Sequence, residues 1–102
     1  MPTWTFLTNH AHVLLCIADD PDARLRDIAA RVGITERATQ RIVAELVDAG
    51  YVTRRRVGRR NHYQVDPDVH FRHPIEEHVA VGALIDLLGG DSRPDPDGKQ
   101  AG

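Results

Sequence analysis

Five arginines stand within seven residues near the middle of the chain, on both sides of Gly58. They are Arg54, Arg55, Arg56, Arg59 and Arg60. Like charges at this density repel one another and destabilise a fold unless an anion lies nearby. Residues 24–63 hold ten arginines against four acidic residues, a local net charge of +6, although the whole chain of 102 residues carries −2. The middle of the chain is therefore the candidate surface for a polyanion.

A second group of polar side chains precedes these arginines, on an amphipathic helix predicted over 35–48 with Thr35 at its N-cap. The buried face of this helix is expected to consist of Thr39, Ile42, Val43 and Leu46. The outward face then presents Glu36, Arg37, Gln40 and Arg41. Arginine and glutamine can bind guanine and adenine edges, Glu36 can accept from cytosine or orient an arginine, and Thr35 with the first N–H groups can hold a phosphate. An ordinary solvated face is the alternative, and the helix alone does not decide between the two.

Two further helices are predicted before this one. Apolar residues at three- and four-residue intervals predict a first helix over 3–18, with Thr3 as its cap. A second helix over 25–32 is predicted to end at Gly33, a residue that suits the left-handed backbone of a helix C-cap. A tight turn then leads into the third helix.

The arginine-rich stretch is predicted to form a hairpin of two strands, over 51–57 and 60–65, that reverses at the glycine between them. Strand alternation turns Arg54 and Arg56 to one face and Arg55 to the other, so the arginines cannot all contact one ligand. A charge cluster that merely protects an edge strand is the alternative for this hairpin.

The order of these elements carries a family resemblance. Residues 27–35 resemble the first half of a helix-turn-helix, with the small Ala29 where two helices touch and a glycine four residues later. Ala-Gly-Tyr-Val at 49–52, which leads into the arginine-rich hairpin, is similar to the wing of the MarR and ArsR families of bacterial regulators. The resemblance covers about residues 10–66. It implies a mainly α winged helix-turn-helix fold, with a three-helix core and a two-stranded wing.

The resemblance also implies a transcriptional regulator that binds double-stranded DNA sequence-specifically. The recognition helix over 35–48 is expected in the major groove, and the wing over 54–61 on the backbone or in the minor groove. The expected DNA-binding residues are Thr35, Glu36, Arg37, Gln40, Arg41, Arg54, Arg56, Arg59, Arg60 and Asn61. A winged-helix module that docks proteins is the alternative function, and regulation by a metal or a small molecule is a further one.

A final helix predicted from Pro74 to Leu88 has more apolar surface than one packing stripe needs, because its apolar residues form two lines about 100 degrees apart. One line can pack on the first helix, and the other needs a partner. A homodimer is expected, since a two-fold pair of recognition helices can read a palindromic operator. The expected dimerisation residues are Ile75, Val79, Val81, Gly82, Leu84, Ile85 and Leu88, with Gly82 allowing close helix approach. Burial of both lines within one monomer is the alternative.

These predictions divide the chain into a winged-helix domain over 1–66, a linker with the dimerisation helix over 67–90, and a disordered tail over 91–102. No apolar run is long enough to span a bilayer, and the chain start does not resemble a signal peptide, so we expect a cytoplasmic protein that joins the nucleoid when bound to DNA. Cys16 lies on an apolar helix face and is expected to be buried.

The sequence offers little for catalysis or cofactors. It contains no glycine-rich phosphate loop and no Cys–His pair at a plausible spacing, so we expect neither an enzyme nor a bound cofactor. His70, His73 and His78 do not have the spacing of a helical ligand set, and we expect no metal site. Trp4 and Phe6 are candidates to line a small-molecule cleft, although packing in the core would equally explain Trp4. No effector is identified.

Overall fold

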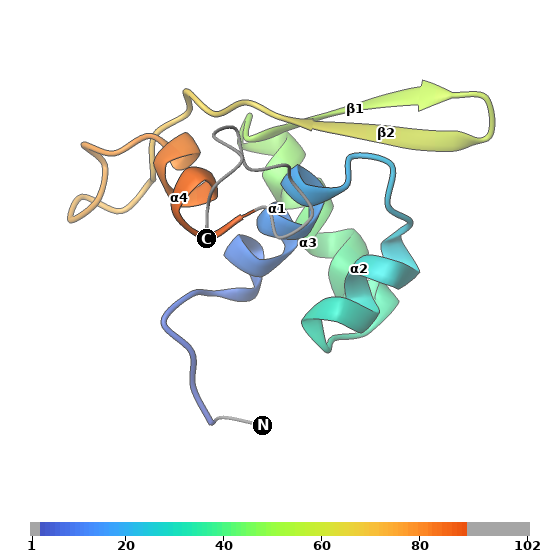
Figure 1. Cartoon of the computed structure of the whole chain (residues 1–102), viewed down its shortest axis with the longest axis horizontal. Helices are drawn as coiled ribbons and strands as arrows, with labels where there is room; N and C mark the ends of the chain where they lie inside the picture. The colour runs from blue at the N-terminus through green and yellow to red at the C-terminus, as the bar shows by residue number, and fades with distance from the viewer. Residues whose placement is uncertain (1–2, 90–102) are drawn as a thin grey trace, which may run out of the picture.

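The computed structural model describes residues 3–89, in the element order helix, helix, helix, strand, strand, helix (Figure 1). The elements are α1 (Asn9–Asp19), α2 (Leu25–Val32), α3 (Glu36–Asp48), β1 (Val52–Val57), β2 (Arg60–Val65) and α4 (Val81–Leu88). The first three helices pack against one another, and the antiparallel β1–β2 hairpin extends beyond them. This arrangement confirms the predicted mainly α winged helix-turn-helix fold, with its three-helix core and two-stranded wing.

One apolar core joins the helices to the base of the hairpin. The predicted inward face of α3 is confirmed, and Cys16 of α1 is buried as expected. Val81 of α4 packs into the same core, so the segment after the wing shares the core of the winged-helix unit. The most deeply buried side chains of this core are Val13, Ile17, Ile28, Val43, Val52, Tyr63 and Val81.

The prediction for the first helix was wrong at its start. The helix begins at Asn9 rather than near Thr3, because the hydroxyl of Thr8 accepts a hydrogen bond from the Ala11 N–H and caps it. Trp4 does not pack in the core: it is 68% exposed, and its ring lies edge-to-face against that of Phe6, with centroids 5.1 Å apart. The apolar spacing that suggested a longer helix therefore included residues with no core to face.

The prediction for the last helix was also wrong, since α4 begins at Val81 and not at Pro74. Residues 70 and 80 instead form an antiparallel bridge, flanked by the hydrogen bonds from Phe71 N to Val79 O and from Val81 N to Val69 O. Ile75 and Val79 therefore lie before α4 and not on a helix. A loop with turns over residues 74–78, closed by this bridge, takes the place of the first half of the helix that apolar spacing had suggested.

Packing within the monomer also revises the two apolar lines expected on this helix. Val81 and Ile85 are buried against the rest of the monomer, while Leu84 is half-buried and Leu88 exposed. Gly82 does make a close approach, but to Pro67 of the same chain: its N–H donates to Pro67 O over 2.9 Å. Val81 and Ile85, two of the expected dimerisation residues, are therefore buried within the monomer and not available to a partner. The tail predicted over 91–102 lies outside the described residues.

Candidate nucleic-acid interface

The turn between α2 and α3 fixes where the third helix begins. Gly33 has a φ of 87°, in the left-handed region that favours glycine, and its N–H donates to Ala29 O over 2.8 Å. Thr35 caps α3, because its Oγ1 accepts a hydrogen bond from the Ala38 N–H over 3.0 Å. These local bonds confirm the predicted end of α2 and the predicted start of α3.

The outward face of α3 carries the polar residues that the sequence placed there. All four, Glu36, Arg37, Gln40 and Arg41, are exposed. Arg37 forms no hydrogen bond or ion pair with any other residue in the described range 3–89, so its guanidinium is available to a ligand. Arg41 differs, because its Nη1 lies 3.7 Å from Oε2 of Glu45, one turn further along α3. The face therefore carries two arginines, and one of them, Arg41, already forms an ion pair with Glu45.

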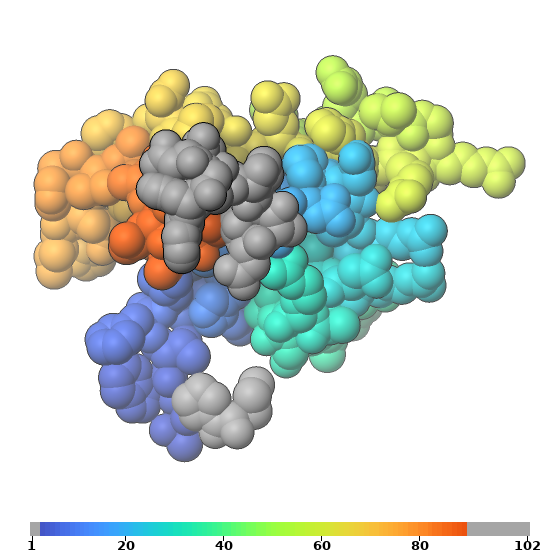
Figure 2. Space-filling view, viewed as in Figure 1, coloured from blue at the N-terminus to red at the C-terminus, as the bar shows by residue number. Residues whose placement is uncertain are grey.

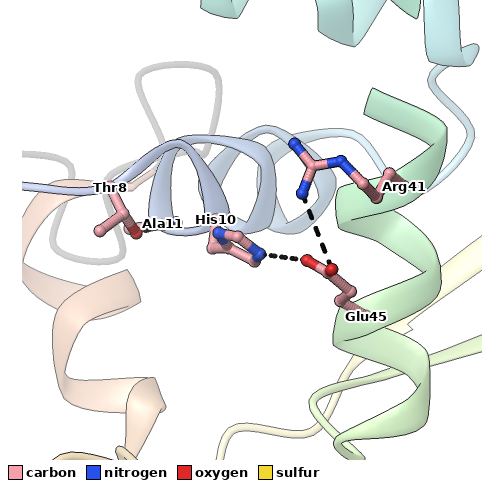
Figure 3. A network of polar contacts seen from close by, with 5 residues as sticks. All are labelled: Thr8, His10, Ala11, Arg41 and Glu45. Carbon is pink, nitrogen blue, oxygen red and sulfur yellow. Dashed lines mark hydrogen bonds and ion pairs between the residues drawn. The ribbon is translucent and has the colours of Figure 1, made fainter. Parts of the chain in front are cut away.

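Glu45 connects Arg41 to α1 (Figure 3). Nε2 of His10 donates a hydrogen bond to Oε1 of Glu45 over 2.6 Å. This bond is the main cause that lowers the pKa of Glu45; the small desolvation of the carboxyl group opposes it, and Arg41 adds to it. The sequence does not indicate this contact, because His10 and Glu45 lie on different helices, 35 positions apart.

The wing has the register that strand alternation predicted. Arg54 pairs with Tyr63 and Arg56 with Asn61 on one face, while Arg55 pairs with His62 on the other. Tyr63 is buried and anchors the base of the hairpin, whereas β1 beyond Val52 is exposed. Figure 2 shows the far end of the hairpin protruding from the body of the molecule. The expected contacts Arg54, Arg56, Arg59 and Arg60 are all exposed, and Asn61 is half-buried.

The loop between α1 and α2 forms hydrogen bonds with strand β2 of the wing. The Tyr63 N–H donates to Pro21 O over 2.9 Å, which extends the hydrogen bonding of β2 onto this loop. Nη2 of Arg60 donates to Asp22 O over 2.8 Å, and Nδ1 of His62 lies 2.8 Å from Asp22 Oδ1. These bonds join β2 to the loop between α1 and α2, and the sequence does not indicate them. No pattern within either segment indicates a contact across 40 positions.

The charges of the wing remain uncompensated. Among residues 3–89, none of the five wing arginines forms an ion pair with a carboxylate. The contacts of Arg56 and Arg60 are to the carbonyl oxygens of Gly58 and Asp22, which leave the positive charges in place. The hairpin is thus a projecting cationic arm beside the cationic face of α3.

A cleft of about 670 Å³ lies between α1, the C-terminal half of α3, α4 and the segment that follows the wing. Apolar side chains of Leu14, Tyr51, Phe71 and Leu84 line it together with His10 and Glu45. Trp4 and Phe6, the expected lining residues, are not part of its wall. Within residues 3–89, no three His, Cys, Asp or Glu side chains come together in a way that would hold a metal ion. No helix in that range has the length and apolar character needed to cross a bilayer.

A model of the MarR family matches residues 5–60, which is more than half of the chain. The chain belongs to the MarR family. Of the two families that the sequence resembled, this match supports MarR rather than ArsR.

One solved structure similar to this MarR-family chain is the crystal structure of the zinc-dependent MarR family transcriptional regulator AdcR in the Zn(II)-bound state. It is 19% identical with a TM-score of 0.47, and the match covers 64% of this chain and 47% of that one. The chain thus corresponds to about half the length of that regulator. No curated protein matches the chain.

Proposed function

We propose that this MarR-family chain binds double-stranded DNA sequence-specifically, with α3 in the major groove and the wing on the backbone or in the minor groove. The observation that carries the proposal is the set of wing arginines that no carboxylate among residues 3–89 neutralises, beside the exposed face of α3. Arg37, Gln40 and Arg41 are assigned to base edges. Thr35, Glu36, Arg54, Arg56, Arg59, Arg60 and Asn61 complete the proposed contact set.

A salt titration of duplex DNA binding tests this function. If the protein neutralises about five to seven phosphates, log K falls with log salt concentration at a slope of about −4 to −6. Arg54→Ala and Arg59→Ala should each reduce the steepness of the slope by about 0.9, because each removes one phosphate contact. Arg72→Ala is the matched control, since Arg72 lies after the wing and lines the cleft instead. A slope near zero for the unmodified chain would refute the proposal.

A combined variant separates DNA binding from docking of a protein. Arg37, Arg41, Arg59 and Arg60 are replaced together by alanine, because a protein interface need not use the cations of both α3 and the wing. DNA affinity should fall by at least 100-fold, on the order of 1–3 kcal/mol for each lost base contact and less for each phosphate. Retained affinity would show that the contact residues are assigned wrongly.

The proposal includes a homodimer that reads a palindromic operator, with half-sites about one duplex turn apart. Of the expected dimerisation residues, Ile75 and Leu88 remain exposed, and Leu87, which precedes Leu88, is exposed as well. Leu88→Gln should weaken the dimer in size-exclusion chromatography without unfolding the monomer. Val57→Gln is the control, because Val57 is an equally exposed apolar residue on the wing. Equal elution of both variants with the unmodified chain would exclude this face.

A further inference from the structure

Glu45 occupies the boundary between the DNA-facing side of α3 and the side that packs on α1. Its side chain is 49% exposed, and its two carboxylate oxygens have different partners. Oε1 accepts from Nε2 of His10 over 2.6 Å, and Oε2 lies 3.7 Å from Nη1 of Arg41. Because Arg41 is one of the proposed base readers and is 63% exposed, a negative charge within the protein already faces one of the cations offered to DNA.

We propose that Glu45 is a positioning residue that restrains Arg41, and that His10 sets how strongly it does so. The inference rests on the proposed DNA-binding function. A carboxylate close to a guanidinium competes with guanine or phosphate for the same N–H donors. Exposed ion pairs are weak, so the competition lowers DNA affinity by a small factor and fixes the orientation of Arg41 without blocking it. Figure 3 shows the arginine side chain turned toward Glu45.

His10 acts through the other carboxylate oxygen. A hydrogen bond donated to Oε1 disperses the negative charge of Glu45 and weakens its attraction for Arg41. Among residues 3–89, His10 is the only residue outside α3 that forms a hydrogen bond or ion pair with Glu45. The other charged groups around the same cleft are Asp48 on α3, and Arg72 and Glu76 after the wing, whose charges are of opposite sign to each other. The link between α1 and the recognition face therefore runs through His10 and Glu45.

A double-mutant cycle in duplex DNA binding tests the proposal on the complete chain. Glu45→Gln should raise affinity about two- to fivefold, the range expected for release of an exposed ion pair. In an Arg41→Ala background the gain in affinity should be smaller. Only the general effect of removing one negative charge near the DNA then remains. Asp48→Asn is the matched control: it removes one exposed acid further along α3, and its effect should be the same with and without Arg41.

His10 variants provide a test with the opposite sign. His10→Ala should lower affinity about twofold, because Glu45 then binds Arg41 more tightly, and His10→Gln should restore it, because an amide can donate the missing hydrogen bond. Neither change should matter in a Glu45→Gln background. Selection of bound sequences from randomised duplexes adds a readout that a purely structural role would not move: Glu45→Gln should change base preference only at the position where Arg41→Ala relaxes it.

The outcomes separate this inference from the proposed function. If the Glu45→Gln gain is the same with and without Arg41, or if His10→Ala raises affinity, the inference is wrong while DNA binding by α3 and the wing stands. If the unmodified chain shows no salt-dependent DNA binding, the proposed function fails and the inference fails with it.

Discussion

Gly82→Ala should destabilise the folded monomer, because a methyl group at this position has no room. A Cβ on Gly82 would lie 2.9 Å from both the Cβ and the carbonyl oxygen of Pro67, and the second of these is backbone that cannot rotate away. The same carbonyl accepts the Gly82 N–H over 2.9 Å, so moving it aside weakens a hydrogen bond at the start of α4. The same shift would also disturb the neighbouring hydrogen bond from Val81 N–H to Val69 O.

Two opposing effects set the size of the loss. Forcing an extra methyl into a packed site costs about 1–3 kcal/mol. Alanine has a better helix propensity than glycine by up to about 1 kcal/mol, less in the first turn where Gly82 lies. The net loss should be about 1–2 kcal/mol, which corresponds to a Tm about 4–16 °C lower in a domain of this size.

Thermal unfolding followed by circular dichroism measures this loss, with Ala83→Gly as the control. Ala83 is exposed on the next position of α4, so its replacement reports helix propensity without a clash. If propensity decided the outcome, Gly82→Ala would raise the Tm while Ala83→Gly lowered it, and that result would refute the close contact with Pro67. If Gly82 lay at a helix–helix contact between two copies, Gly82→Ala would instead weaken the dimer and make the Tm loss depend on protein concentration.

Two further predictions concern α3. Thr35→Ala should lower the free energy of unfolding by about 1 kcal/mol and the Tm by about 4–8 °C, because it removes the hydroxyl that accepts the Ala38 N–H. Thr35→Ser keeps a hydroxyl and should retain most of this stability. Equal Tm values for the alanine variant and the unmodified chain would contradict the prediction. The lowered pKa of Glu45 means that its contribution to stability is present above the ordinary value of 4.5 and is lost as pH falls through the lower folded value. The Tm difference between the unmodified chain and Glu45→Gln should therefore shrink as pH falls below about 4.5, and a difference that grew on acidification would reverse the assigned sign.

The parts of the interface that the sequence predicted well are those fixed by neighbours in the chain. Thr35 caps a helix through a residue three positions on, and Gly33 adopts the left-handed backbone that a tight turn requires. Alternation along β1 and β2 determines which arginines share a face, and the register agrees with it. Capping, turn geometry and alternation are short-range effects, so the local sequence contains the information that decides them.

The parts that the sequence predicted wrongly depend on contacts between distant segments. Apolar spacing indicated a helix from Pro74, but residues 74–78 form turns inside a loop that the bridge between His70 and Ala80 closes, and α4 begins only at Val81. Likewise, spacing does not show whether an apolar residue has a core to face, and Trp4 has none. The contacts of His10 with Glu45 and of His62 with Asp22 join residues that become neighbours only after the fold forms.

The same contacts explain how a chain of net charge −2 presents a cationic surface. Three of the acids close to α2, α3 and the wing are engaged within the protein: Asp19 with Arg31, Asp22 with His62, and Glu45 with His10 and Arg41. Two of these three carboxylates have a histidine as partner, so their negative charges are held by hydrogen bonds without using a wing arginine. Net charge sums over the whole surface, whereas binding to a polyanion depends on the local field at the contact. The excess of arginines over acids in residues 24–63, a local net charge of +6, therefore makes α3 and the wing suitable for DNA.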